Sequence, residues 1–435
     1  MQVSIESLEG LERKMTVQIP SDTVNQAVEK KLKDLTKTVR VDGFRPGKVP
    51  LKVVQQKYGG HIRQEVLGDV IESSYREAIT QENIRPAGMP SIESVNSEGT
   101  EEVSYTAVFE IFPEVEKLNL DSIQVEKIEA TVVDADFDAM VEKLRQQHKE
   151  WVEVERAAAN GDQVMVDFEG RIGGELFEGG SGSGMAVEIG AGQMLPEFEA
   201  GLEGISVGEE KVVEVNFPED YHGTDVAGKT AQFNLRATKI SEPKLPEVDA
   251  EFIKAFGIEN GDLEKFRSDV RNNMEKELEQ RVKQAVKNAA LEGLLAENDI
   301  IAPAAMVTEE IKSQKNQAVQ RMGQDPETFD ISNLPDEMFK EEARKRVQIG
   351  LLVGELIKNE KIELDNSRVE TTLSDMASSY EDPAQVTEFY RQNREARASL
   401  ENMVLEEQVV DYILDKAKVT TKQSSFEEVM NGTAG

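Results

Sequence analysis

The sequence contains no cysteine, which excludes disulfide bonds, thiolate nucleophiles and cysteine-ligated zinc. Its three histidines, His61, His148 and His222, are isolated, and neither a His-Glu-x-x-His pair nor a Ser/His/Asp grouping is recognisable. The glycine-rich run at 179–184 lacks the Lys-Ser/Thr ending of a phosphate loop, so we predict a flexible turn there. We therefore expect a protein that works without a metal, a nucleotide or another cofactor.

Long apolar runs are also missing. No stretch approaches the roughly 18–20 apolar residues that span a bilayer. The first residues, MQVSIESLEGLERK, lack the basic start and apolar run of a signal peptide. The expected location is the cytoplasm, with no membrane partner.

Aromatic residues make up only 6% of the chain, with one tryptophan. This scarcity argues against one large, tightly packed catalytic body and favours open, helix-lined surfaces. The length of 435 residues suits roughly three domains of about 100–200 residues each.

The net charge is −34, from 84 acidic against 50 basic residues, and such a surface repels other polyanions. One segment is different. Residues 30–57 hold nine bases and two acids, a net charge of +7, so the remainder carries −41. Such a run is often only a solvated face, but on an acidic protein it also suits one localised anionic partner.

The first 115 residues have the pattern of one α+β domain. Strands are predicted at 12–19 and 103–111, where apolar residues alternate, with Ser21 or Asp22 as the N-cap of a following helix. Apolar residues recur at helical spacing from 24 to 35 and again from 62 to 79. Residues 41–50, between the two helices, contain two glycines and two prolines and are predicted to be a loop.

The remaining chain divides into three further segments by pattern. Residues 116–149 have the pattern of a connection and a helix, and 150–245 that of a compact, mostly antiparallel β domain with a short helix near 198–202 and a linker at 241–246. From 246 to 435 almost everything is helical. Helices are predicted along 266–296 and at roughly 303–322, 335–359, 366–380 and 394–417.

The loop places Phe44 beside Arg40, Arg45 and Lys48. An aromatic residue beside arginine is typical of an interface anchor, and arginine and lysine bind phosphate groups. The same composition also suits a turn whose phenylalanine packs back on its own domain. The loop's composition alone leaves both interpretations open.

Residues 43–50, GFRPGKVP, match the G-F-R-x-G-x-x-P ribosome-docking signature of bacterial trigger factors. The chain resembles this family along essentially its whole length, including Tyr-Glu-Asp-Pro at 380–383. The resemblance implies contact with protein and RNA of the large ribosomal subunit, beside the nascent-chain exit tunnel. The implied contact residues are Phe44, Arg45 and Lys48, and the implied loop-shaping residues are Gly43, Gly47 and Pro50.

The β domain resembles the FKBP-type prolyl isomerases through four ordered segments, GDQVMVDFEG at 161, ELFEG at 175, EIG at 188 and MLPEFEAGL at 194. It departs from them at Glu197, where many members have glycine, and has Phe198 where single-domain relatives often have tryptophan. The resemblance implies a catalytic pocket lined by Phe168, Phe177, Glu178, Met194, Leu195, Phe198, Tyr221 and Phe233. The same aromatics also suit the plain core of a small β domain.

Prolyl isomerisation suits such residues, because rotation about a peptide bond meets a barrier of roughly 18–20 kcal/mol and needs no nucleophile or metal. An apolar pocket favours the less polar, twisted amide, and a few hydrogen bonds fix its geometry. Tyr221 is the expected donor to a substrate carbonyl.

The resemblance implies an ATP-independent chaperone that docks at the ribosome, binds nascent and unfolded polypeptides in an all-helical C-terminal domain, and isomerises X-Pro bonds. It leaves room for a weak homodimer away from the ribosome. Two alternatives stay open: a free prolyl isomerase whose helical region recruits substrates, and a non-catalytic assembly factor whose β domain only binds peptides.

Overall fold

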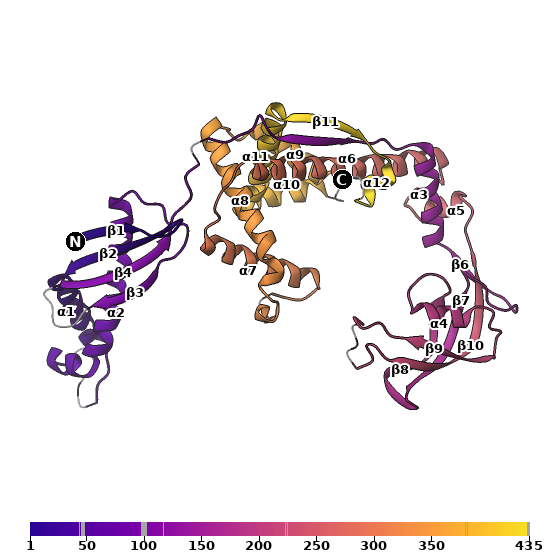
Figure 1. Ribbon diagram of the computed structural model, residues 1–435, viewed down its shortest axis with the longest axis horizontal. Helices are drawn as coiled ribbons and strands as arrows, with labels where there is room; N and C mark the ends of the chain where they lie inside the picture. The colour runs from indigo at the N-terminus through magenta and orange to yellow at the C-terminus, as the bar shows by residue number, and fades with distance from the viewer. Residues whose placement is uncertain are drawn as a thin grey trace. The chain divides into compact units, whose positions relative to one another are not determined.

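The computed structural model describes residues 1–42, 44, 48–96, 102–115, 117–221, 223, 225–326, 328–378, 380 and 382–432 (Figure 1). The chain divides into two compact units. Unit 1 comprises Met1–Ile128 and Lys283–Lys422, and unit 2 comprises Glu129–Val282 and Gln423–Gly435. The long helix α6 (Leu263–Ala296) contributes residues to both units. Among the described residues, no helix combines the length and the apolar character needed to cross a membrane.

Unit 1 begins with a four-stranded antiparallel sheet in the order β1-β2-β4-β3. Its strands are β1 (Gln2–Ser7), β2 (Glu12–Pro20), β3 (Ser91–Asn96) and β4 (Glu102–Glu110). The predicted strands at 12–19 and 103–111 are confirmed as β2 and β4. Alternate residues such as Met15 and Tyr105 are buried, which explains the apolar alternation in the sequence. The sequence did not predict β3, whose six residues are all exposed and so lack an apolar alternation.

Two helices, α1 (Ser21–Thr38) and α2 (Leu51–Gln81), pack with this sheet. Tyr75 and Ala78 of α2 join the buried residues of β2 and β4 in one core cluster. The predicted N-cap is wrong: β2 runs directly into the helix, so Pro20 is the N-cap and Ser21 is already helical.

The Tyr75 hydroxyl is buried and has no hydrogen-bond partner in the part of the chain that the structure describes. Burial raises the pKa of Tyr75 to about 12. Because an unpaired buried hydroxyl is a net penalty, we expect Tyr75→Phe to keep the free energy of unfolding or raise it by about 1 kcal/mol, in urea unfolding. Tyr105, whose hydroxyl lies 3.0 Å from the Ser74 hydroxyl, is the control, and Tyr105→Phe should lower it by about 1 kcal/mol. Equal destabilisation by both changes would contradict this account.

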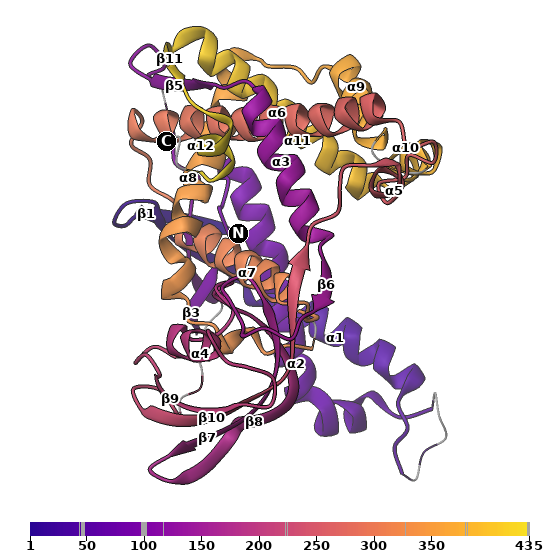
Figure 2. The ribbon, with the colours of Figure 1, turned by 90° about the vertical axis from the view of Figure 1, so that its right-hand side faces the viewer.

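The rest of unit 1 is mainly helical. The helices predicted from the apolar periodicity are confirmed to within a few residues, whereas α10 was not predicted. The described elements are α7 (Ala304–Arg321), the 3-10 helix η1 (Ile331–Asn333), α8 (Glu337–Glu360), α9 (Asn366–Ala377), α10 (Pro383–Gln392) and α11 (Arg394–Lys416). A two-stranded ribbon of β5 (Gln124–Glu129) and β11 (Lys418–Gln423), side by side in Figure 2, was also not predicted.

Unit 2 contains a five-stranded antiparallel sheet in which β10 pairs with three other strands. The strands are β6 (Glu150–Glu153), β7 (Gln163–Ile172), β8 (Glu175–Glu188), β9 (Glu210–Asn216) and β10 (Thr230–Lys244). The predicted short helix is α4 (Pro196–Leu202), which packs against β9 and β10 (Figure 2). The unit also holds α3 (Asp134–Gln147), α5 (Ala250–Lys254) and α12 (Phe426–Met430).

Two segments of unit 2 contradict the sequence predictions. The glycine run at 179–184 is not a turn but part of β8. Its glycines are needed there, because a Cβ on Gly180 or Gly182 would lie 2.7 Å from a ring carbon of Phe177 or Phe168. Residues 241–244 are not a linker either, since they pair with β6 at the end of β10.

Candidate functional site

An apolar cavity of about 630 Å³ lies in unit 2, a volume typical of small-ligand sites. All eight residues predicted to line a catalytic pocket surround it, although they come from distant parts of the sequence. They are Phe168 on β7, Phe177 and Glu178 on β8, Met194 and Leu195 before α4, Phe198 on α4, Tyr221 in the β9–β10 connection and Phe233 on β10.

Phe233 is the centre of the aromatic wall. Its ring lies 5.4 Å from Phe198 and 6.0 Å from Phe177, both edge to face, and it also contacts Phe168 and Phe217. A Cβ on Gly170 would lie 2.5 Å from the Phe233 ring, so glycine leaves the space that this ring occupies. Such edge-to-face contacts add about 0.5–1.5 kcal/mol each to burial and hold the rings in one arrangement.

The sequence prediction missed part of the wall. Phe217 lies directly after β9, and its ring centre is 4.8 Å from that of Tyr221 and 6.0 Å from that of Phe177. Met185, Val215 and Val226 also line the cavity. In the sequence Val213, Val215 and Phe217 alternate as in a strand, but nothing in such an alternation tells which residues face a cavity.

Polar groups are few in this cavity. Glu178 is the only charged side chain among the described residues that line it, and it is exposed. Glu197 does not line it and instead lies 3.5 Å from the Asn216 side-chain amide. Chemically, the cavity offers a rigid aromatic surface and one phenol, which suits binding and reshaping of an apolar amide.

The loop between α1 and α2 is described in part. Gly43, Arg45 and Gly47 lie outside the described residues. Phe44 is 40% exposed, Lys48 is exposed, and Pro50 is the N-cap of α2. Val49, the residue after Lys48, is buried in one core cluster with Val54 and Ile62 of α2. The end of the loop is therefore anchored in the core of this domain.

Part of the basic segment is neutralised by ion pairs. Lys31 lies 3.0 Å from Glu65 and 2.9 Å from Asp69 of α2, and Lys33 and Lys37 pair with acids of α1. The predicted positive charge is therefore reduced along α1.

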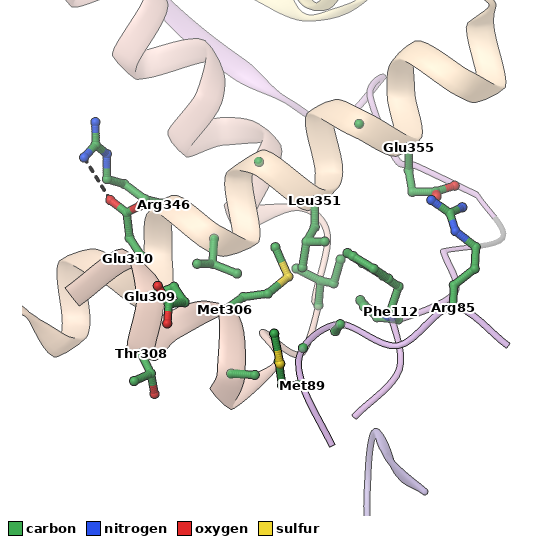
Figure 3. A pocket seen from close by; sticks show the side chains of 18 of the residues that line it. Arg85, Met89, Phe112, Met306, Thr308, Glu309, Glu310, Arg346, Leu351 and Glu355 are labelled. Carbon is green, nitrogen blue, oxygen red and sulfur yellow. Dashed lines mark hydrogen bonds and ion pairs between the residues drawn. The ribbon is translucent and has the colours of Figure 1, made fainter. Parts of the chain in front are cut away.

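A second cavity, of about 1130 Å³, lies within unit 1 (Figure 3). Phe112, Met306 and Leu351 point toward its interior, whereas Met89 lies at its rim. The Arg85 guanidinium lies 5.5 Å from the centre of the Phe112 ring. The Glu110 carboxylate joins its two walls by accepting a hydrogen bond of 3.0 Å from the Ala305 amide. A Cβ on Gly350 or Gly354 of α8 would meet nothing within 4 Å, so this helix presents a bare face to the cavity.

Comparison with known proteins agrees with this architecture. Family models match over three stretches: bacterial trigger factor protein at 1–144, FKBP-type peptidyl-prolyl cis-trans isomerase at 154–237, and the trigger factor C-terminus at 262–415. The trigger factor of Thioalkalivibrio sulfidiphilus is 49% identical over 433 residues, covering 99% of this chain and 98% of that protein. That of Psychromonas ingrahamii is 44% identical over 431 residues, covering 99% of each.

A solved structure of the trigger factor chaperone, from work on promiscuous substrate recognition in its folding and assembly activities, shares the fold. Its TM-score is 0.50 at 20% identity, with 95% of this chain and 99% of that chain covered.

The β sheet, the short helix and the aromatic cavity of unit 2 define an FKBP-type peptidyl-prolyl isomerase domain. That domain stands between two segments matching trigger factor models, and relatives match along the whole chain. The chain belongs to the bacterial trigger factor family. It is a chaperone with an N-terminal ribosome-binding domain and an isomerase domain.

Proposed function

We propose that the cavity of unit 2 is the isomerase site and that Phe168, Phe177, Glu178, Met194, Leu195, Phe198, Tyr221 and Phe233 act there. The observation that supports this most is their convergence on one cavity of suitable size. A proline ring fits an aromatic wall, and an apolar surrounding favours the twisted amide because its charge separation is smaller than in the planar form. Tyr221 donates a hydrogen bond to a substrate carbonyl and holds the peptide across the wall.

This role of Tyr221 predicts a moderate loss on Tyr221→Phe. One neutral hydrogen bond contributes about 0.5–1.5 kcal/mol, so kcat/KM for an X-Pro peptide should fall about two- to twelvefold, measured by NMR exchange between the cis and trans isomers. Tyr380→Phe is the control, because Tyr380 is 61% exposed in unit 1. An unchanged kcat/KM in Tyr221→Phe would show that the Tyr221 hydroxyl donates no hydrogen bond that the reaction needs.

We also propose that the loop at 41–50 docks the chain on the large ribosomal subunit at the exit tunnel. Docked there, the chain acts as an ATP-independent chaperone in the cytoplasm. The exposed Phe44 and Lys48 support this, since an exposed phenylalanine beside bases suits a surface of protein and RNA. Arg45 is the third contact residue, and Gly43, Gly47 and Pro50 set the shape of the loop.

The docking proposal predicts that changing Phe44, Arg45 and Lys48 together to alanine weakens ribosome binding at least about a hundredfold, because hot-spot residues contribute about 2 kcal/mol or more each. Co-sedimentation with purified ribosomes measures it. The control is Lys33→Ala with Lys37→Ala, which also removes two positive charges, but from α1, where both are already ion-paired. Equal weakening by both variants would mean that charge alone, and not this loop, holds the ribosome. No binding by the intact chain would favour a free isomerase.

For client binding we propose the cavity of unit 1. Its methionines support this, because flexible thioethers adapt to varied apolar partners. Met89 is 95% exposed at the rim, which is unusual for a large apolar side chain without a partner. We propose nascent and unfolded polypeptides as the partners that bind in this cavity. We also propose that two copies of the chain form a weak homodimer away from the ribosome.

The functional division that we propose follows the sequence pattern. Residues 1–115 form the ribosome-binding domain, 116–149 the connection, 150–245 the isomerase domain and 246–435 the helical chaperone domain. The four-stranded sheet within the first segment and the five-stranded sheet within the third support these boundaries.

A further inference from the structure

A buried carboxylate lies directly behind the wall of the unit 2 cavity. Glu199 follows Phe198 on α4 and is 6% exposed, and it does not line the cavity. One of its oxygens accepts hydrogen bonds from the amides of Gly190 at 2.9 Å and Gly192 at 3.3 Å. The other accepts from the Met194 amide at 2.9 Å. Among the described residues, no lysine, arginine or histidine forms an ion pair with it.

These amides all belong to the segment between β8 and α4, which supplies Gly192, Gln193, Met194 and Leu195 to the cavity. The segment forms neither helix nor strand, and Gly190 and Gly192 have φ of +87° and +68°. At its start, the Ile189 amide donates to the Asp162 carbonyl and the Ala191 amide to the Glu188 carbonyl. Its path is therefore set by what its amides bind, and the carboxylate of Glu199 binds three of them.

The charge of Glu199 is part of this arrangement. Burying a carboxylate is unfavourable unless donors compensate for lost water, and converging backbone amides do so. Burial acts to raise the pKa of Glu199, but the hydrogen bonds from Met194, Gly192 and Gly190 outweigh it and hold the pKa below its ordinary value. The ionised form is thus the one that fits, because each oxygen can then act only as an acceptor.

We propose that Glu199 is a positioning residue for prolyl isomerisation, acting through the segment that carries Met194 and Leu195. This inference rests on the proposed isomerase site. A shift of about 1 Å in a group that shapes a reacting complex is enough to lower a rate about a hundredfold. Glu199 therefore affects the reaction without touching the substrate.

The test is Glu199→Gln in the full chain. Glutamine keeps the size but replaces one acceptor oxygen by an NH2 donor, which faces a backbone N–H and repels it. We expect kcat/KM to fall about tenfold to a hundredfold, with the loss mainly in kcat. The amide proton signals of Gly190, Gly192 or Met194 should move upfield in the same variant as their hydrogen bonds lengthen.

Asp162→Asn is the matched control. Asp162 is as buried, at 2% exposed, and accepts hydrogen bonds from Arg156 and from the Ala159 amide, but it does not line the cavity. The Asp162→Asn variant should be less stable than the parent chain, yet keep its kcat/KM at a temperature where it is folded. If Glu199→Gln does not fold, Glu199→Asp keeps the charge on a shorter side chain and should give intermediate activity.

The outcomes separate the two proposals. Isomerisation by the intact chain with unchanged kcat/KM in Glu199→Gln overturns the role of Glu199 alone, as does an equal loss in Asp162→Asn. An intact chain that does not isomerise the peptide overturns the proposed site itself.

Discussion

Phe198→Ala is expected to abolish most of the isomerase activity, lowering kcat/KM at least about a hundredfold, and to destabilise unit 2 by about 3–5 kcal/mol. Phe198 is only 2% exposed, and its ring meets those of Phe168 at 5.7 Å and Phe233 at 5.4 Å, both edge to face. Removing its ring enlarges the cavity, and the rings of Phe168 and Phe233 lose the surface that fixes their orientation. Binding to ribosomes should stay unchanged, because the docking loop lies in unit 1.

The matched control is Phe266→Ala. Phe266 is 1% exposed and lies in the aromatic cluster of unit 2 with Phe252, outside the cavity. The control should lose similar stability, followed by the fluorescence of Trp151, the single tryptophan, while kcat/KM per folded molecule stays intact. If Phe198→Ala keeps its activity, or if Phe266→Ala loses as much, then the cavity is not the site. Phe198→Leu is the substitute if the alanine variant does not fold.

Replacing Gly350 and Gly354 by glutamine is expected to remove most of the client binding of the chain, raising the client Kd about tenfold or more. A side chain at either glycine has room, and two long polar side chains would fill the apolar cavity of unit 1. Loss of about 50 Å² of apolar contact with a client corresponds to about 1.3 kcal/mol, which is about a factor of ten. Binding of an unfolded, proline-free polypeptide, measured by calorimetry, avoids any contribution from the isomerase site.

The control for this change is alanine at both positions. Either substitution favours the helix by about 0.5–1 kcal/mol for each glycine replaced, so both variants should be at least as stable as the parent chain. Only the glutamine variant fills the cavity, and only it should lose affinity. Equal affinity of the two variants would place client binding elsewhere in the chain.

The strongest sequence predictions rested on patterns that physical chemistry fixes locally. Apolar residues at helical spacing determine which face of a helix is buried, so α6, α8 and α11 were predicted to within a few residues. The eight cavity residues were instead predicted from the resemblance to the FKBP-type prolyl isomerases, and the structure brings them together. Their roles in the reaction stay predictions until they are measured.

The errors have physical causes as well. Exposed strands such as β3 carry no apolar alternation. The strands β5 and β11 are exposed at most of their positions and pair across almost 300 residues of sequence. The glycines at 180 and 182 suggested a turn. The structure shows instead that a strand needs residues without a side chain at these two positions, because two phenylalanine rings lie over them. Glu199 was passed over because a lone glutamate on a short helix carries no signal, and only the fold shows that three amides converge on it.

The most direct test of the isomerase site is where a proline ring lies when an X-Pro peptide binds to the intact chain. Nuclear Overhauser contacts from the proline protons to methyl-labelled methionines answer this in one spectrum. The account predicts contacts with Met194 and Met185, which line the cavity of unit 2. Contacts confined to Met89 and Met306, in the cavity of unit 1, would contradict it.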